Sequence, residues 1–135
     1  MADYTPVTIE GEVATSTATA TIKGGDVLEV SGSGTVAPIT PGATPSVKVV
    51  GMAVSDTNNG GRVSFYCFGP IHESIADGTV TAGDQVVTAT TAARQVRTLA
   101  AVTTPTAADV VGTRAILGVA LTTAADNTKV RWMTR

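Results

Sequence analysis

Cys67, His72 and Glu73 come closest, by residue type and spacing, to a set that could perform covalent catalysis. A cysteine nucleophile needs a histidine base within hydrogen-bond reach and a third group that orients the base. Cys67, however, alternates with Val63 and Phe65 along a strand-like stretch, which is the pattern of a small core residue. We therefore expect Cys67 to lie in the core and the protein not to be an enzyme.

Metal and cofactor sites are also not predicted. One histidine and one cysteine are too few for a zinc site. Residues 56–60 (DTNNG) resemble the start of a calcium loop, but Cys67 falls where that loop requires glutamate. Residues 25–30 (GDVLEV) resemble part of biotinyl and lipoyl domains, which carry their cofactor on a lysine at a hairpin tip. The tip here is NNG (58–60), so we expect no cofactor.

The charge pattern argues against nucleic acid and membranes as partners. The formal net charge is −2, and 15% of the residues are charged. No apolar run reaches the roughly 20 residues of a membrane helix, and residues 1–12 lack the basic and apolar regions of a secretory signal. Arginines are more frequent in the C-terminal half, but no row of aromatic residues accompanies them for base stacking: Arg94, Arg97, Arg114, Arg131 and Arg135.

The elements that position these residues are predicted to be short strands. Residues 47–54 are largely apolar, residues 55–61 form a dense turn signal, and residues 62–68 alternate with a period of two. This pattern predicts a hairpin, and a second hairpin is expected over 113–121 and 128–133. Helical periodicity is absent apart from one possible turn over 107–111, capped by Thr106.

The two halves of the chain repeat one pattern. VGMAV (50–54) aligns with LGVAL (117–121), and GDVLEV (25–30) aligns with GDQVVT (83–88). Two copies are too few for a solenoid, so they predict one compact all-β domain with an internal pseudo-repeat. We expect a small barrel or sandwich of short antiparallel strands, and the pattern does not separate these two architectures.

Length and composition predict a single domain with an N-terminal extension. At 135 residues the chain suits one domain. Residues 1–21 are predicted to be an extended arm and linker, and residues 22–135 the β-domain. The single tryptophan, Trp132, has two interpretations: an anchor at a subunit interface, or the one large side chain that fills a core poor in aromatic residues.

Five ordered segments resemble the capsid decoration (cement) proteins of tailed bacteriophages, which are small, β-rich and trimer-forming. The resemblance covers residues 24–135 and leaves the arm unmatched. The segments are GDVLEV (25–30), GTVAP (34–38), VGMA (50–53), GDQV (83–86) and LGVA (117–120).

The resemblance implies a structural virion protein that is assembled in the host bacterial cytoplasm and has no enzymatic activity. As a homotrimer it would bind the major capsid protein on the outer capsid surface and brace neighbouring capsomers of the expanded head. We expect the arm to dock on the capsid through Tyr4, Val7 and Ile9, because an extended segment can add to a sheet edge of a partner. Subunit contacts are expected from sheet edges and Trp132.

A receptor- or glycan-binding β-module of a tail fibre or spike is the alternative. Such a module uses exposed aromatic rings to stack on sugars. The two tyrosines and one tryptophan of this sequence are few for that purpose. Both interpretations predict a phage structural protein, and they differ in whether the partner is the capsid or the host surface.

Overall fold

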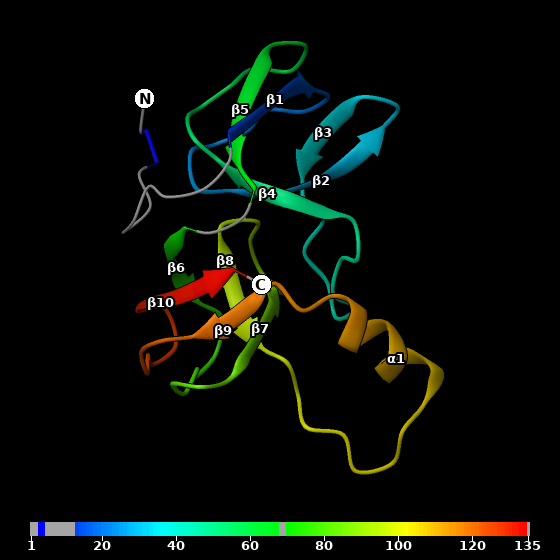
Figure 1. The fold of residues 1–135 in the computed structure, drawn as a ribbon, viewed down its shortest axis with the longest axis vertical. Coiled ribbons are helices and arrows are strands. Elements are labelled where there is room, and N and C mark those ends of the chain that lie inside the picture. The colour runs from blue at the N-terminus through cyan, green and yellow to red at the C-terminus, as the bar shows by residue number, and fades with distance from the viewer. Residues whose placement is uncertain (1–2, 5–12, 68–69, 135) are drawn as a thin grey trace.

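The computed structural model describes residues 3–4, 13–67 and 70–134. In this part of the chain, strands form two closed five-stranded barrels that lie one above the other in Figure 1. The prediction of an all-β fold is confirmed, and the architecture is a barrel rather than a sandwich. Each half of the sequence forms a barrel of its own, where one barrel or sandwich was expected. None of the helices among the described residues is long and apolar enough to cross a membrane.

The first barrel is closed in the order β1-β3-β2-β4-β5. The predicted hairpin is formed by β4 and β5, with Met52 opposite Tyr66. The expectation of purely antiparallel strands is wrong at one place, because β1 and β3 pair in parallel. Its strands are β1 (Val13–Ala18), β2 (Val27–Gly32), β3 (Thr35–Pro38), β4 (Val49–Ala53) and β5 (Arg62–Tyr66).

The second barrel repeats the first strand by strand. It is closed in the order β6-β8-β7-β9-β10, and its one parallel pair, β6 with β8, corresponds to β1 with β3. The internal pseudo-repeat is therefore present in the topology as well as in the sequence. Its strands are β6 (Ile71–Ala76), β7 (Gln85–Thr88), β8 (Gln95–Thr98), β9 (Gly118–Ala120) and β10 (Lys129–Thr134).

The repeated Gly-Asp pair forms the same turn in both barrels. Gly25 and Gly83 adopt φ angles of 89° and 94°, which glycine tolerates without a steric penalty. The following carboxylates accept a backbone N–H from three residues upstream: Lys23 N–H to Asp26 (2.8 Å) and Thr81 N–H to Asp84 (2.9 Å). A local hydrogen bond thus explains why the Gly-Asp pattern marks the start of β2 and β7.

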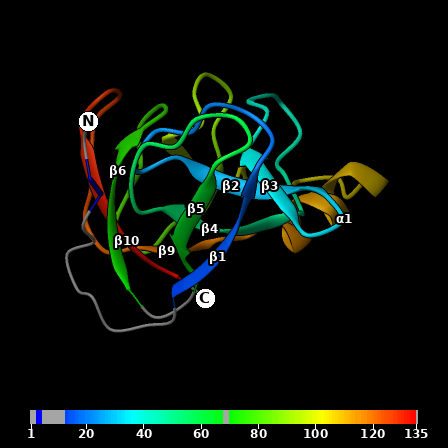
Figure 2. The same cartoon turned by 90° about the horizontal axis from the view of Figure 1, so that it is seen from above.

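The two copies differ in the connection that precedes their last hairpin. In the second copy this connection carries α1 (Ala107–Arg114), which lies at the periphery, away from β6 and β10 (Figures 1 and 2). The Asp109 carboxylate accepts hydrogen bonds from the backbone N–H (2.6 Å) and the hydroxyl of Thr106, which stabilises the first turn. The helix is longer than the single predicted turn, and the strand expected from residue 113 begins instead at Gly118.

β1 lies inside the stretch predicted to be arm and linker. It pairs with β5 over residues 13–17 and closes the first barrel. The folded part of the chain therefore begins no later than Val13, before the expected boundary at residue 22. Closed barrels have no free edge strands. Subunit contacts were expected from sheet edges, but neither of the two described barrels has an open edge for such a contact.

The barrel cores meet at the junction of the two halves. Val27, Ile39 and Met52, which belong to the first half, are buried in one cluster with Val86, Val96 and Trp132 of the second. A separate cluster fills the first barrel, around Leu28, Val63 and Phe65. Because apolar side chains of both halves are buried together, the hydrophobic effect holds the two barrels as one body.

Candidate functional site at the junction of the two barrels

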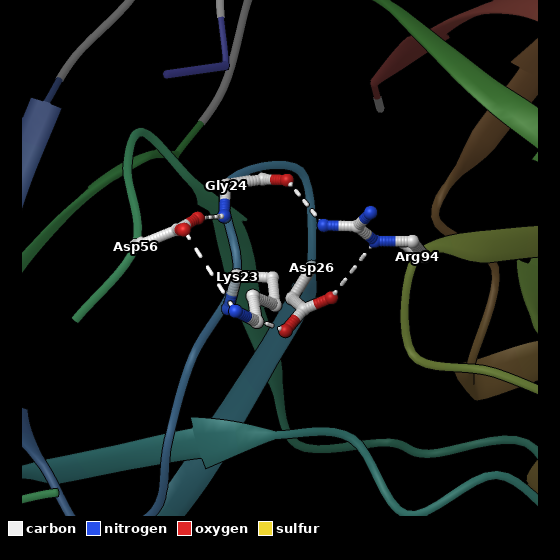
Figure 3. A network of polar contacts seen from close by, with 5 residues as sticks. All are labelled: Lys23, Gly24, Asp26, Asp56 and Arg94. Atoms are coloured by element: carbon white, nitrogen blue, oxygen red, sulfur yellow. Dashed lines mark hydrogen bonds and ion pairs between the residues drawn. The ribbon is translucent and has the colours of Figure 1, made fainter. Parts of the chain in front are cut away.

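An arginine of the second barrel reaches a turn of the first barrel (Figure 3). Arg94 lies in the loop between β7 and β8, and its guanidinium donates to the Gly24 carbonyl (3.0 Å) and lies 3.5 Å from the Asp26 carboxylate. Asp26 is only 6% exposed, so this charge is shielded from water. The backbone N–H of Val27 also donates to the Ala93 carbonyl (2.8 Å). Polar contacts therefore reinforce the shared core.

The same turn is held from its other side within the first barrel. Asp56 accepts the backbone N–H of Gly24 (2.9 Å), and its carboxylate lies 3.9 Å from the Lys23 ammonium. Asp56 opens the segment that resembled a calcium loop, and here it orders a protein turn. Among residues 3–4, 13–67 and 70–134, no three His, Cys, Asp or Glu side chains gather in a way that could hold a metal ion.

Tyr4 connects the N-terminal segment to both barrels. Its backbone N–H donates to the Val54 carbonyl, and its hydroxyl lies 2.6 Å from Nδ1 of His72 on β6. The hydroxyl also accepts the backbone N–H of Glu73 (3.3 Å). Burial raises the pKa of Tyr4, so the phenol keeps its proton and donates it to His72. One residue of the predicted arm is thus a folded contact of the domain itself.

His72 is the centre of an aromatic cluster. The Tyr4 ring stacks on it, with 5.6 Å between the ring centroids and an interplanar angle of 22°. The centroid of the Trp132 ring lies 4.9 Å from that of the imidazole. The imidazole has no exposed surface, and this burial lowers the pKa of His72 to about 4. The ring is therefore neutral near pH 7, and acceptance at Nδ1 assigns its proton to Nε2.

Nε2 of His72 has no hydrogen-bond partner among the described residues. An unsatisfied buried donor of this kind costs about 1–3 kcal/mol. Native proteins rarely leave such groups unpaired, so each one calls for an explanation.

His72 also lines a pocket of about 110 Å³ between the barrels. β4, the strand β10 and the segment that follows α1 provide the other walls, and Cys67 lies at the same pocket. The pocket lining combines aliphatic side chains with polar ones, among them Ser46, Arg114 and Thr134. A site of this composition can hold a small group with an apolar part.

Two of the three residues first considered for catalysis are engaged by other partners. Nδ1 of His72 is occupied by Tyr4, and the Glu73 carboxylate faces Lys129 (3.1 Å) and Arg131 (3.3 Å) on β10. The hydrogen bond from Lys129 is the largest influence on Glu73 and lowers its pKa. Burial opposes this change, and the hydrogen bond from Arg131 lowers the pKa further. Glu73 therefore faces Lys129 and Arg131 and is not placed to orient His72 as a base.

The residues predicted to bind partners fall in different places. Tyr4 is half-buried at the junction, while Val7 and Ile9 lie outside the described residues. Trp132 is 2% exposed, and its indole N–H donates to the Ser74 hydroxyl (3.0 Å), so it fills the core. Almost no indole surface is left for a second subunit, which matches the core interpretation of this residue.

Sequence reasoning missed the roles of His72 and Arg94. His72 sits in a strand with alternating burial, which on its own indicates a core position. Arg94 was noted as part of the basic bias, but its partner Gly24 is 70 residues away in sequence. No local pattern marks such a pair.

Comparison with known proteins supports the fold. No family model matches the sequence, and no curated protein matches it either. The fold is similar to a solved structure described as the N base of head fiber gp8.5 in bacteriophage phi29, with a TM-score of 0.58. The two sequences are 16% identical, and the similarity covers 92% of this chain and 93% of that chain. The likeness thus extends over both barrels.

Proposed function

We propose that this chain is a structural protein of a phage virion that sits on the outer surface of the head. The observation that carries the proposal is the two-barrel fold, which it shares along nearly its whole length with the N base of a phage head fiber. The resemblance of five ordered sequence segments to phage decoration proteins supports the same role independently. A non-enzymatic function follows from this proposal.

In its specific form, the proposal is a decoration protein that binds the major capsid protein as a homotrimer and stabilises the expanded head. The joined barrels suit this task, because a rigid block can brace neighbouring capsomers against outward pressure. Their core is continuous and the Arg94–Gly24 contact crosses the junction. Three copies acting together would release slowly even if each contact were weak.

A fibre module is the second candidate, because the similar solved structure is itself the base of a fiber. In that case the barrels would form the mount of a longer assembly, and recognition of a host receptor or glycan would belong to the fibre. Binding to heads is expected of a decoration protein and of a head-fibre base, whereas binding to host cells is expected of a receptor-binding module alone.

Co-sedimentation with expanded, undecorated heads of the parent phage tests the proposal. We expect saturable pelleting of the full-length chain and none with unexpanded heads. A chain that begins at Val13 keeps β1 but lacks residues 1–12, which include the predicted capsid contacts Tyr4, Val7 and Ile9. A Tyr4→Phe variant keeps these residues in place but loses the hydrogen bond to His72. Loss of pelleting for the first variant alone would place the capsid contact in residues 1–12.

If full-length protein fails to pellet with expanded heads, a position on the head surface is wrong. If the same protein preparation then binds to intact host cells or to a glycan array, this result would support the receptor-binding candidate. Retained pelleting of both variants would keep the head-surface role and move the contact to the barrels.

A further inference from the structure

We propose that the outer face of β9 and β10 on the second barrel is a contact surface for a second copy of this chain. Four apolar residues form this surface, the β9–β10 face: Ile71, Val119, Leu121 and Met133. The inference rests on the proposed homotrimer only in that it names the surface through which copies meet. It can fail while the proposed position on the head remains correct.

The β9–β10 face is built by neighbouring strands in register. Met133 of β10 lies opposite Ile71 of β6 on one side and opposite Val119 of β9 on the other. The backbone N–H of Leu121 donates to the Arg131 carbonyl (2.7 Å), which continues the pairing of β9 with β10. Leu121 therefore lies on the same face as Val119, two residues earlier. The alternate residues of both strands are buried in the core, so the four side chains form one outward-facing patch.

This patch is apolar and open to water. Met133 is 46% exposed and Leu121 is 43% exposed, while Ile71 and Val119 are half-buried. The helix α1 lies away from β6 and β10 and does not cover the patch (Figures 1 and 2). Apolar side chains gathered at one place on a surface mark a contact site, and methionine is enriched in such sites.

The pseudo-repeat shows what fits such a face. An equivalent row of outward-facing residues crosses the first barrel. The equivalence follows from Gly51 and Gly118, whose Cβ positions would meet the carbonyl oxygens of Tyr66 and Met133 respectively. The two rows are Val13, Tyr66, Met52 and Val27 in the first barrel, and Ile71, Met133, Val119 and Gln85 in the second.

The row of the first barrel is the surface through which that barrel meets the second. Met52 and Val27 are buried in the core cluster that the two halves share. Tyr66 packs edge-on against the Tyr4 ring, with 6.2 Å between the ring centroids. A row of this kind therefore already docks on a barrel within each molecule, whereas Met133, the equivalent of Tyr66, stays open to solvent.

An apolar outer row does not suit the last unit of a stack. In proteins built of stacked repeats, the terminal units carry a polar outer face that ends the stack. The C-terminal barrel instead presents Met133 and Leu121. Its closed sheet has no edge strand, so a sheet face is the surface left for contact. Since a barrel of this chain covers the equivalent row within each molecule, the occupant that the fold specifies is a barrel of a second copy.

Charges frame the face and allow copies to approach. On the same side of the sheet, Glu73 lies 3.1 Å from Lys129 and 3.3 Å from Arg131. These ion pairs give the apolar centre a polar rim, which is the usual arrangement of a protein interface. The rim carries both signs and the chain has a formal net charge of −2, so copies repel one another only weakly.

Sedimentation of the full-length protein in the absence of heads tests the contact. We expect association that increases with protein concentration up to about 1 mM. Met133→Gln combined with Leu121→Gln should weaken it at least about tenfold, because both changes place polar groups in the contact. The matched control, Val30→Gln with Val102→Gln, changes residues that are each 44% exposed and lie outside the face. It should leave the association unchanged.

Methyl NMR of the methionines locates the contact without any substitution. The chain has three methionines, and Met52 is 2% exposed inside the junction of the barrels. As the concentration is raised through the midpoint of association, we expect the Met133 signal to shift and the Met52 signal to stay in place. The spectrum of the Met133→Gln variant assigns the first of these signals.

Three results would overturn the proposal. The first is a wild-type protein that stays monomeric up to about 1 mM. The second is association that both double variants weaken equally, and the third is a shift of the Met52 signal without one of Met133. If the monomeric wild type nevertheless bound heads and the face variant did not, the face would belong to the capsid contact. That outcome would reject a second copy as the occupant and leave the head-surface role intact.

Discussion

At the scale of single residues, His72 and Tyr4 show how one contact organises the junction. His72 is a neutral imidazole enclosed by aromatic rings, and Tyr4 is held against it by a 2.6 Å hydrogen bond. This arrangement requires an unprotonated Nδ1. The contact is therefore sensitive to pH. Burial favours the neutral form of His72, so a fall in pH that protonates the ring weakens the contact.

We expect the protein to lose stability as the pH falls from about 6.5 to about 4. The unfolded chain takes up a proton on His72 near pH 6.5, its ordinary pKa, whereas the folded chain does so only near pH 4. The contribution of His72 to the free energy of unfolding is fully present above pH 6.5. As the pH falls toward 4, up to about 3 kcal/mol of it is lost. Urea unfolding at several pH values measures it.

A His72→Phe variant is the control for this titration, because it removes the only histidine while keeping an aromatic ring in the cluster. Its free energy of unfolding should change little between pH 7 and pH 5.5. Equal losses for the variant and the wild type over that range would show that another group causes the effect.

At the scale of elements, two glycines allow the last hairpin of each barrel to form. Gly51 on β4 and Gly118 on β9 occupy equivalent positions in the two copies. A Cβ atom at either position would collide with the backbone carbonyl oxygen of the neighbouring strand, at Tyr66 and Met133 respectively. The glycine of the repeated xGxAx pattern is thus required by close approach of two strands.

Substitution by alanine should therefore destabilise both barrels. We expect Gly51→Ala and Gly118→Ala each to cost about 2 kcal/mol or more, since backbone atoms must move to make room. Gly42→Ala is the matched control, because nothing lies within 4 Å of its Cβ position and its φ angle is not positive. Thermal unfolding of the three variants measures the difference, and a similar Tm for all three would refute the explanation.

At the scale of the whole molecule, the two barrels form a single unit although each is closed on its own. Closure satisfies the backbone hydrogen bonds of each barrel, so it does not by itself connect them. The connection comes from the shared apolar cluster and from polar contacts such as Arg94 with Gly24 and Asp26. The bracing role proposed above would require this rigidity.

We expect calorimetry to show one cooperative unfolding transition for the whole chain, because unfolding one barrel would expose the core shared with the other. Arg94→Gln should lower the free energy of unfolding by about 1 kcal/mol without splitting the transition. Arg62→Gln, at an exposed residue outside this network, should have a smaller effect. Two separate transitions in the wild type would show that the barrels are independent.

The sequence by itself determined the local features of this protein. Apolar and alternating stretches located the strands of the two predicted hairpins, and the Gly-Asp pairs and the xGxAx glycines revealed the repeat, because these signals depend on residues close together in the chain. The hairpin of β4 and β5 was predicted for the same reason. The resemblance to phage decoration proteins also rested on such short segments.

Only the tertiary structure decided how many barrels form, how they close and what joins them. The parallel pairing of β1 with β3, the Tyr4–His72 hydrogen bond and the Arg94–Gly24 contact link residues 18 to 70 positions apart. The Tyr4–His72 and Arg94–Gly24 contacts have no counterpart in a local pattern, since their energy appears only when both barrels have closed. For the same reason, the junction pocket and the unpaired nitrogen of His72 are properties of the fold and not of any segment.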